Sequence, residues 1–222
     1  MSNYATYIQN IANILKQRMI CSDTSPLVGG YNYKKGECNI AKLRFKIDIP
    51  RNTKPSVSFL NAFLDVSYKE TNDTDIPISQ YCFGITIVGQ NENGTVKSAW
   101  HLDYDDSEGQ DYIHPHFHLT WGGNTIKDMN LGDILLLPAP RISYPPMDVV
   151  LGIDFVLSNF VKSDIYKQIQ SDSQYKAAVK SAQEKYWKPY MLSLAHHWCN
   201  NSCYQAKFQT INAKCFHPTL VE

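Results

Sequence analysis

The sequence predicts an α+β fold, in which a mainly antiparallel β-sheet over residues of about 40–138 is packed by N-terminal and C-terminal helices. Three observations predict it. Apolar residues recur at helical spacing over 4–19, apolar and polar residues alternate over 42–49, and helical patterning returns from about residue 146. Strands are therefore concentrated in the middle of the chain and helices at both ends, an element order typical of α+β proteins.

The composition is that of a folded chain. Of its 222 residues, 43% are hydrophobic and 19% are charged, which is enough apolar material to bury a core. No repeat or linker separates the strand-rich part from the helical part, so we expect one domain over 1–222. Its sheet half covers about 28–138 and its helical half about 146–199.

The charge balance argues against a dominant function in binding nucleic acids or membrane surfaces, although a local basic patch is compatible with it. The 21 Lys and Arg residues are balanced by 21 Asp and Glu residues, whereas proteins that bind nucleic acids or membrane surfaces usually carry a basic excess. No apolar run reaches the roughly 18 residues that span a membrane. The N-terminus lacks a signal-peptide pattern and the six cysteines are dispersed. We therefore expect free thiols and a cytoplasmic location.

The first predicted element is an amphipathic N-terminal helix. Its apolar residues fall on one stripe at spacings of three and four, formed by Tyr4, Ile8, Ile11, Leu15 and Met19. The following run of Ser, Asp, Thr and Pro residues is expected to end it.

The strands come next. Residues 42–49 alternate regularly, 57–68 form a longer strand whose imperfect period indicates a bulge, and 80–89 form a third. Residues 91–94 carry a hairpin-turn signal. The continuously apolar run 133–138 predicts a buried strand near the end of the sheet.

The second half is predicted to be helical. Two prolines precede a helix over 147–160 that has Asp148 in its first turn. Ser163 and Asp164 are expected to cap the next short helix. A long amphipathic segment over 174–197 contains Pro189, which we expect to kink or split it.

One stretch, residues 100–123, gathers the residues that suggest chemistry. His114, His116 and His118 alternate with apolar residues, and His101 and Asp103 do the same just upstream. In an extended hairpin all five side chains would point to one face of the sheet. The alternative is that they form a polar outer face or a hydrogen-bonded network without catalytic function.

The histidines suit a divalent transition metal, because imidazole is a common ligand of zinc, manganese and iron. We predict a metal site formed by His101, His114, His116 and His118 and a catalytic set formed by His101, Asp103 and His116. A metal-bound water would make the protein a hydrolase of the phosphodiesterase or nuclease kind. Asp103, or an acidic loop residue such as Asp105 or Asp111, is a candidate to orient an imidazole or to act as a base.

A second enzymatic hypothesis needs no metal. Two imidazoles across a cleft can act as general base and general acid, as in metal-free phosphodiester cleavage. Within the proline-rich connection over 138–148, Arg141 is a candidate anion-binding residue, with a purely structural arginine as the alternative.

The C-terminal tail carries a weaker candidate, a structural zinc site. Cys199, Cys203, Cys215 and His217 have the spacing C-x3-C-x11-C-x-H, with buried thiols on a helix as the alternative.

A non-catalytic function is the last hypothesis. Fourteen tyrosines and four tryptophans suit a protein that docks onto a protein partner or onto a second copy of itself. In that case the protein is a subunit or adaptor of an assembly that docks through its helical half.

Overall fold

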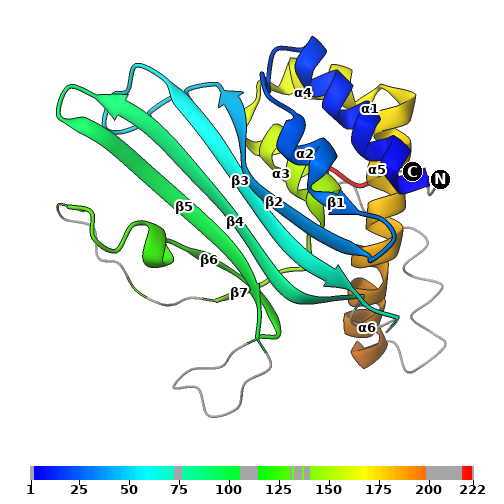
Figure 1. Ribbon diagram of the computed structural model, residues 1–222. Coiled ribbons are helices and arrows are strands. Elements are labelled where there is room, and N and C mark those ends of the chain that lie inside the picture. The colour runs from blue at the N-terminus through cyan, green and yellow to red at the C-terminus, as the bar shows by residue number, and fades with distance from the viewer. Residues whose placement is uncertain are drawn as a thin grey trace.

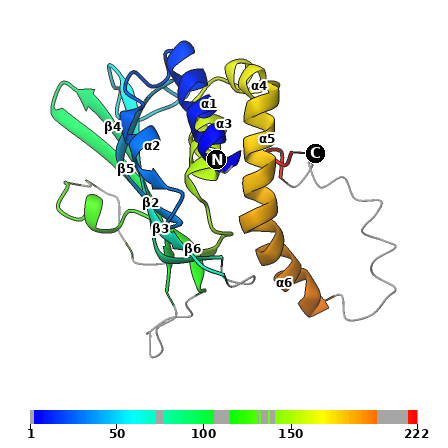
Figure 2. The ribbon, with the colours of Figure 1, turned by 45° about the vertical axis from the view of Figure 1, so that its right-hand side comes forward.

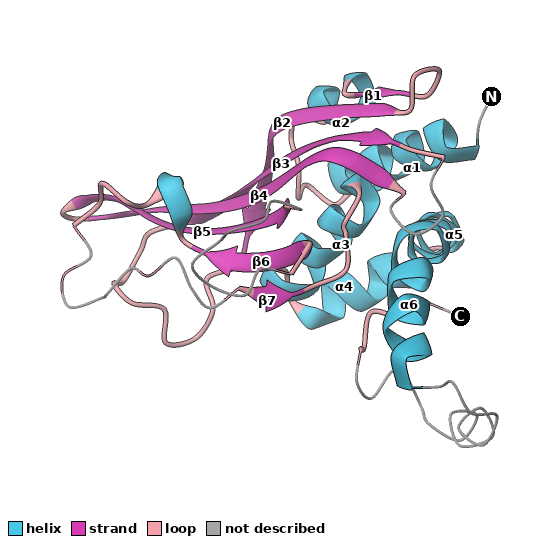
Figure 3. Cartoon of the chain, turned by 90° about the horizontal axis from the view of Figure 1, so that it is seen from below, coloured by secondary structure: helices cyan, strands magenta, loops and turns pink. Residues whose placement is uncertain are grey.

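The computed structural model describes residues 3–72, 77–105, 115–130, 132, 137, 141–198 and 217–221. Its α+β class is as predicted, with a curved antiparallel sheet on one side and helices gathered on the other (Figures 1 and 2). Each strand pairs with the next strand along the chain (Figure 3). The strands are β1 (Tyr31–Asn32), β2 (Glu37–Ile47), β3 (Leu60–Glu70), β4 (Ile78–Asn91), β5 (Gly94–Tyr104), β6 (Phe117–Trp121) and β7 (Ile142–Ser143).

The predicted strands are present with longer bounds. The β4–β5 hairpin turns at the expected place, because Asn91 pairs with Gly94. The predicted irregularity lies in β3, where the register against β4 shifts between Ser67 and Lys69. Of the predicted strand 133–138, only Leu137 is among the described residues, and it is 53% exposed.

Eight helical segments are described. They are α1 (Asn3–Gln17), α2 (Ser25–Gly29), η1 (Gly123–Thr125), α3 (Val149–Phe160), α4 (Ser163–Gln170), α5 (Ser173–Ala182), the π-helical η2 (Gln183–Trp187) and α6 (Lys188–Trp198). None of the described helices combines the length and the apolar character needed to cross a membrane.

Three details of the predicted helices change. Met19 lies beyond the end of α1 with a φ of 54° and is 82% exposed, so it is not part of the buried stripe. Asp148 precedes the first turn of α3 and caps it, since its carboxylate accepts a 2.9 Å hydrogen bond from the Leu151 backbone amide. The cap position of α4 is Lys162, so the predicted capping by Ser163 and Asp164 is wrong.

Pro189 does mark a break in the long helical segment. It is the second residue of α6, and the turn immediately before α6 is π-helical. A proline ring cannot donate the hydrogen bond of a regular helix, and π-helical turns accommodate such local mismatches. The three elements α5, η2 and α6 still follow one another as a single column (Figure 2).

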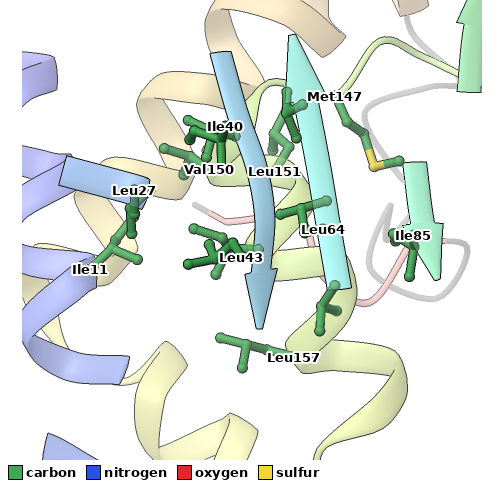
Figure 4. Packing of buried hydrophobic residues seen from close by; sticks show 14 of the residues in the cluster. Ile11, Leu27, Ile40, Leu43, Leu64, Ile85, Met147, Val150, Leu151 and Leu157 are labelled. Carbon is green, nitrogen blue, oxygen red and sulfur yellow. The ribbon is translucent and has the colours of Figure 1, made fainter. Parts of the chain in front are cut away.

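The core lies between the sheet and α3. Side chains of Leu43, Leu64 and Ile85 pack toward Leu151 and Leu157 (Figure 4). Eight residues of α3 are buried, as expected for a helix covered on several sides. Because side chains alternate along a strand, every second side chain of β5 and β6 points into this core and the others point to the opposite face of the sheet.

Candidate functional site

The candidate site lies on the face of β5 and β6 that points away from the core. The register places Asp103 of β5 opposite His118 of β6, and His101 opposite Thr120. Leu102, between the two β5 residues, is fully buried on the core side. Because side chains alternate along a strand, His101, Asp103, His118 and Thr120 share one face.

His101 and Asp103 interact directly. The imidazole Nε2 of His101 lies 3.2 Å from Oδ2 of Asp103, and both side chains are about one-third exposed, at 31% and 38%. A carboxylate only accepts hydrogen bonds, so Nε2 carries the hydrogen and donates it. In the neutral ring Nδ1 is then unprotonated and is able to accept a proton.

Gly123 leaves room for the His101 ring. The chain turns at Gly122 and Gly123, which have φ values of 93° and 71°. A Cβ at position 123 would lie 2.9 Å from Cε1 and 3.1 Å from Nδ1 of His101. Glycine is therefore required both by the backbone conformation and by the close approach of the imidazole edge.

His118 is held by the chain that leads into β6. Its side chain is 3% exposed, and Nδ1 lies 3.0 Å from the carbonyl oxygen of Pro115. Nδ1 is the donor of this hydrogen bond, because a carbonyl oxygen has no hydrogen to give. The strand begins at Phe117, two residues after a proline that cannot donate to the sheet.

Thr120 brings an unsatisfied hydroxyl to the same face. It is 7% exposed, and among the described residues its Oγ1 is one of two buried side-chain polar atoms without a hydrogen-bond partner. An unpaired buried hydroxyl costs about 1–3 kcal/mol, so such a group indicates a place where a ligand or water binds. Thr120 continues the alternation of His114, His116 and His118 in the sequence, but nothing there marks its hydroxyl as unpaired.

These residues line one cavity of about 610 Å³, which we call the site pocket. His101, Asp103, His118 and Thr120 line it together with Arg141, the predicted anion-binding residue. The volume is in the usual range for a small-molecule site.

Two further charged residues line the site pocket. Lys127, which the sequence analysis did not single out, brings a second cation. Asp105, expected to orient an imidazole, also lines the pocket, and its backbone amide donates a 2.9 Å hydrogen bond to the carbonyl oxygen of His116. Lys127 is missed because it follows the Gly122–Gly123 turn at no recognisable spacing from the histidines.

Of the other predicted metal ligands, His116 is described and does not line this pocket. His116 is exposed and precedes β6, and its ring lies against Tyr104 with 5.8 Å between centroids. His114 and Asp111 lie outside the described residues. Within the described part of the chain, no group of three or more His, Cys, Asp or Glu side chains is arranged to hold a metal ion. The four-histidine site remains a prediction, because His114 is one of its members.

The predicted structural zinc site lies mostly outside the described residues. The residues outside the described part of the chain include Cys199, Cys203 and Cys215. His217 is described, and its ring packs against Trp187 with 4.7 Å between centroids while Nδ1 lies 3.0 Å from Oγ1 of Thr219. Burial lowers the pKa of His217.

Comparison of the chain with protein-family models, with curated proteins and with solved structures gives no match. The chemistry of the site pocket is therefore the basis on which a function is inferred.

Proposed function

We propose that the protein hydrolyses a phosphate ester, specifically a phosphodiester, by acid–base catalysis in the site pocket. One observation carries the proposal: a single cavity is lined by the His101–Asp103 pair and by the cations Lys127 and Arg141. Such a pocket suits a reaction in which a proton leaves an attacking water while negative charge grows on phosphoryl oxygens.

The two imidazoles have opposite roles in this proposal. Nδ1 of His101 accepts a proton from water, whose oxygen forms a bond to phosphorus. The phosphorus–oxygen bond to the leaving group breaks, and His118 in its imidazolium form gives that oxygen a proton. Asp103 keeps the hydrogen of His101 on Nε2, 3.2 Å away, and stabilises the ring once it is charged.

The remaining polar residues bind the phosphate group. The guanidinium of Arg141 presents paired donors that match two phosphoryl oxygens, whereas the exposed Lys127 contributes a point charge. The unpaired Thr120 hydroxyl gains a hydrogen bond to a third oxygen. Substrate binding thus satisfies a group that the described part of the chain leaves unsatisfied.

A metal-dependent form of the same hydrolysis is the variant in which zinc, manganese or iron binds His101, His114, His116 and His118. The ion would then lower the pKa of a bound water and so activate the nucleophile in place of the base His101. Chelation distinguishes the two forms.

The test uses bis(4-nitrophenyl) phosphate as substrate and follows release of 4-nitrophenolate before and after treatment with EDTA. We expect turnover to survive EDTA, to be lost in His101→Ala, and to be unchanged in His196→Ala, which removes an exposed histidine on α6. Loss of turnover with EDTA and its recovery with zinc or manganese would show that the hydrolysis is metal-dependent and would overturn the metal-free form. Absence of both turnover and phosphate binding would overturn the proposal.

A non-catalytic subunit is the second candidate function, and α6 is the observation that favours it. Met191, Leu192 and Leu194 are 41%, 57% and 43% exposed on this helix. Several exposed apolar side chains on one helix are typical of a docking surface, here for a second copy of the chain. A mass by light scattering that falls from dimer to monomer in Leu192→Asp would support it, and a monomeric wild-type protein would exclude it.

A further inference from the structure

A second pocket lies on the helical side of the protein, away from the site pocket. It has a volume of about 490 Å³ and is formed by α3, α4, η2 and the C-terminal residues 217–219. It shares no lining residue with the site pocket. We call it the helical pocket.

Asp154 of α3 contributes a buried carboxyl group to the wall of the helical pocket. Its side chain is 2% exposed. Oδ1 accepts hydrogen bonds from the hydroxyl of Tyr166 at 3.1 Å and from that of Tyr175 at 2.8 Å. Within the described part of the chain, Oδ2 has neither a hydrogen-bond partner nor an ion-pair partner.

An acid this deeply buried is costly when it is charged. Burial raises the pKa of Asp154 to about 6, although the two tyrosine hydroxyls counteract the rise. At neutral pH the group is therefore ionised, and Oδ2 is the carboxylate oxygen that no described residue engages. A cation placed against Oδ2 would offset the cost of this buried charge.

Aromatic rings form much of the remaining wall. Tyr144 and Phe155 meet edge to face, with 6.3 Å between centroids and 88° between planes. Trp187 is fixed by a 3.1 Å hydrogen bond from its indole Nε1 to the carbonyl oxygen of Pro146. Faces of such rings attract organic cations, especially where water is excluded.

The other ionisable groups of the helical pocket leave room for a positive ligand. The ring of His217 packs against Trp187, and its Nδ1 lies 3.0 Å from Oγ1 of Thr219, so these contacts do not involve the carboxylate. Lys167 also lines the pocket, but its side chain is exposed, so its charge is screened by solvent. The buried charge of Asp154 therefore determines what the pocket accepts.

We propose that the helical pocket binds a small organic ammonium compound, with Asp154 as the counter-ion and the aromatic rings of Tyr144, Phe155 and Trp187 around its apolar part. The ammonium group donates to Oδ2, which no residue of the described chain engages. The proposal is independent of the hydrolytic function, because the two pockets have separate walls.

Calorimetric titration with three ligands of the same size tests this. Benzylamine should bind. Benzyl alcohol should bind at least about tenfold more weakly, because its neutral hydroxyl cannot make a charge-assisted hydrogen bond to Asp154. Benzoate should not bind, because its carboxylate has the same charge as that of Asp154. Asp154→Asn should weaken benzylamine binding by at least about tenfold. The control Asp164→Asn, at an exposed position of α4, should leave it unchanged.

A measurement on the wild-type protein tests the proposal even if the Asp154→Asn variant misfolds. In nuclear magnetic resonance spectra, benzylamine should shift the indole N–H signal of Trp187 and leave that of Trp121 in place, because Trp121 lies in β6 and donates to Ser98. Equal affinity for benzylamine and benzyl alcohol, or no shift of the Trp187 signal, would overturn the proposal.

Discussion

The imidazole Nε2 of His101 lies 3.2 Å from Oδ2 of Asp103, two residues further along the same strand. Residues two apart on a strand point the same way, so β5 alone holds the pair together without a loop. This relationship sets the tautomer of His101 and turns Nδ1 toward Gly123. The first three predictions depend on it or on the cavity around it.

Asp103→Asn should lower kcat for bis(4-nitrophenyl) phosphate by about 100-fold and change KM little. The asparagine amide can donate to Nε2, which moves the ring hydrogen to Nδ1 and removes the proposed base. Steady-state kinetics check the split between kcat and KM. Asp128→Asn, at an exposed position beyond η1, is the matched control. An unchanged kcat in Asp103→Asn would rule out the assigned role of the carboxylate.

Arg141→Ala should weaken binding of inorganic phosphate by about tenfold, since it removes a charge-assisted and bidentate contact. Arg141→Lys should recover only part of the affinity, because an ammonium cannot match two oxygens at once. Isothermal calorimetry with phosphate measures both. Arg51→Ala, which removes an exposed arginine between β2 and β3, serves as control. Equal phosphate affinity in Arg141→Ala and wild type would remove Arg141 from the site.

Gly123→Ala should abolish turnover while the protein remains folded. The new Cβ would lie 2.9 Å from the His101 ring and would also face a φ of 71°, so the ring or the chain must move. Gly132→Ala is a matched control, because Gly132 has a φ of 58° but no atom of the described residues, its chain neighbours aside, lies within 4 Å of the position that an added Cβ would take. Kinetics measure the loss of turnover, and circular dichroism shows whether the variant remains folded. Similar turnover in the two variants would mean that contact with His101 is irrelevant.

The elements that could be predicted from sequence are those with a strong local period. The alternation in β2 and the apolar stripe of α1 each report burial on one face, and both elements formed. The predicted stripe includes Met19 wrongly, because an apolar stripe does not say where its helix ends. That end depends on a residue adopting a left-handed φ of 54°.

The candidate site was predictable only in part, for a similar reason. His101, Asp103 and His118 share a face because strand alternation is local. His116 does not join β6, since strand pairing starts after the Pro115 region, and a histidine pattern carries no information on that start. Thr120 follows the same local alternation, two residues after His118. Arg141 lines the pocket from the segment just before β7, and no spacing from the histidines encodes that approach.

Asp154→Asn should change how stability depends on pH. The pKa of this buried carboxyl is about 6 in the folded protein and 3.8 is its ordinary value. The folded state thus binds more protons than the unfolded state between these values, so the free energy of unfolding of the wild type falls as the pH rises through that window. At 1.36 kcal/mol per pKa unit, the total loss is about 3 kcal/mol.

Asparagine at position 154 does not titrate, and its Oδ1 can still accept from Tyr166 and Tyr175. Denaturant unfolding from about pH 4 to about pH 7 should therefore show the variant gaining up to about 3 kcal/mol relative to wild type. Glu92→Gln, in the exposed β4–β5 turn, should track wild type across the window. A constant difference between Asp154→Asn and wild type at all pH values would contradict the raised pKa.

Gly152→Ala should destabilise the protein, although alanine is the better helix former. Gly152 lies on the buried α3, where an added Cβ would be 2.6 Å from Cε2 of Phe83 and 3.5 Å from Cδ1 of Leu64. Overpacking of this kind costs about 1–3 kcal/mol and outweighs a propensity gain of about 1 kcal/mol at most. Phe83 is fully buried and cannot move its ring into solvent.

The matched control for Gly152→Ala is Gly29→Ala in α2, where no described atom outside the helix's own backbone and the neighbouring residues lies within 4 Å of the added Cβ. This variant should unfold at the same denaturant concentration as wild type or at a slightly higher one, because only helix propensity changes. Guanidinium unfolding of both variants gives their stabilities. The difference between them separates the effect of the contact with the sheet from the effect of helix propensity alone. If Gly152→Ala were as stable as Gly29→Ala, α3 would not rest on β4 at the distance described. Because β4 pairs with the strand that carries His101 and Asp103, the two variants also test the support on which the site pocket is built.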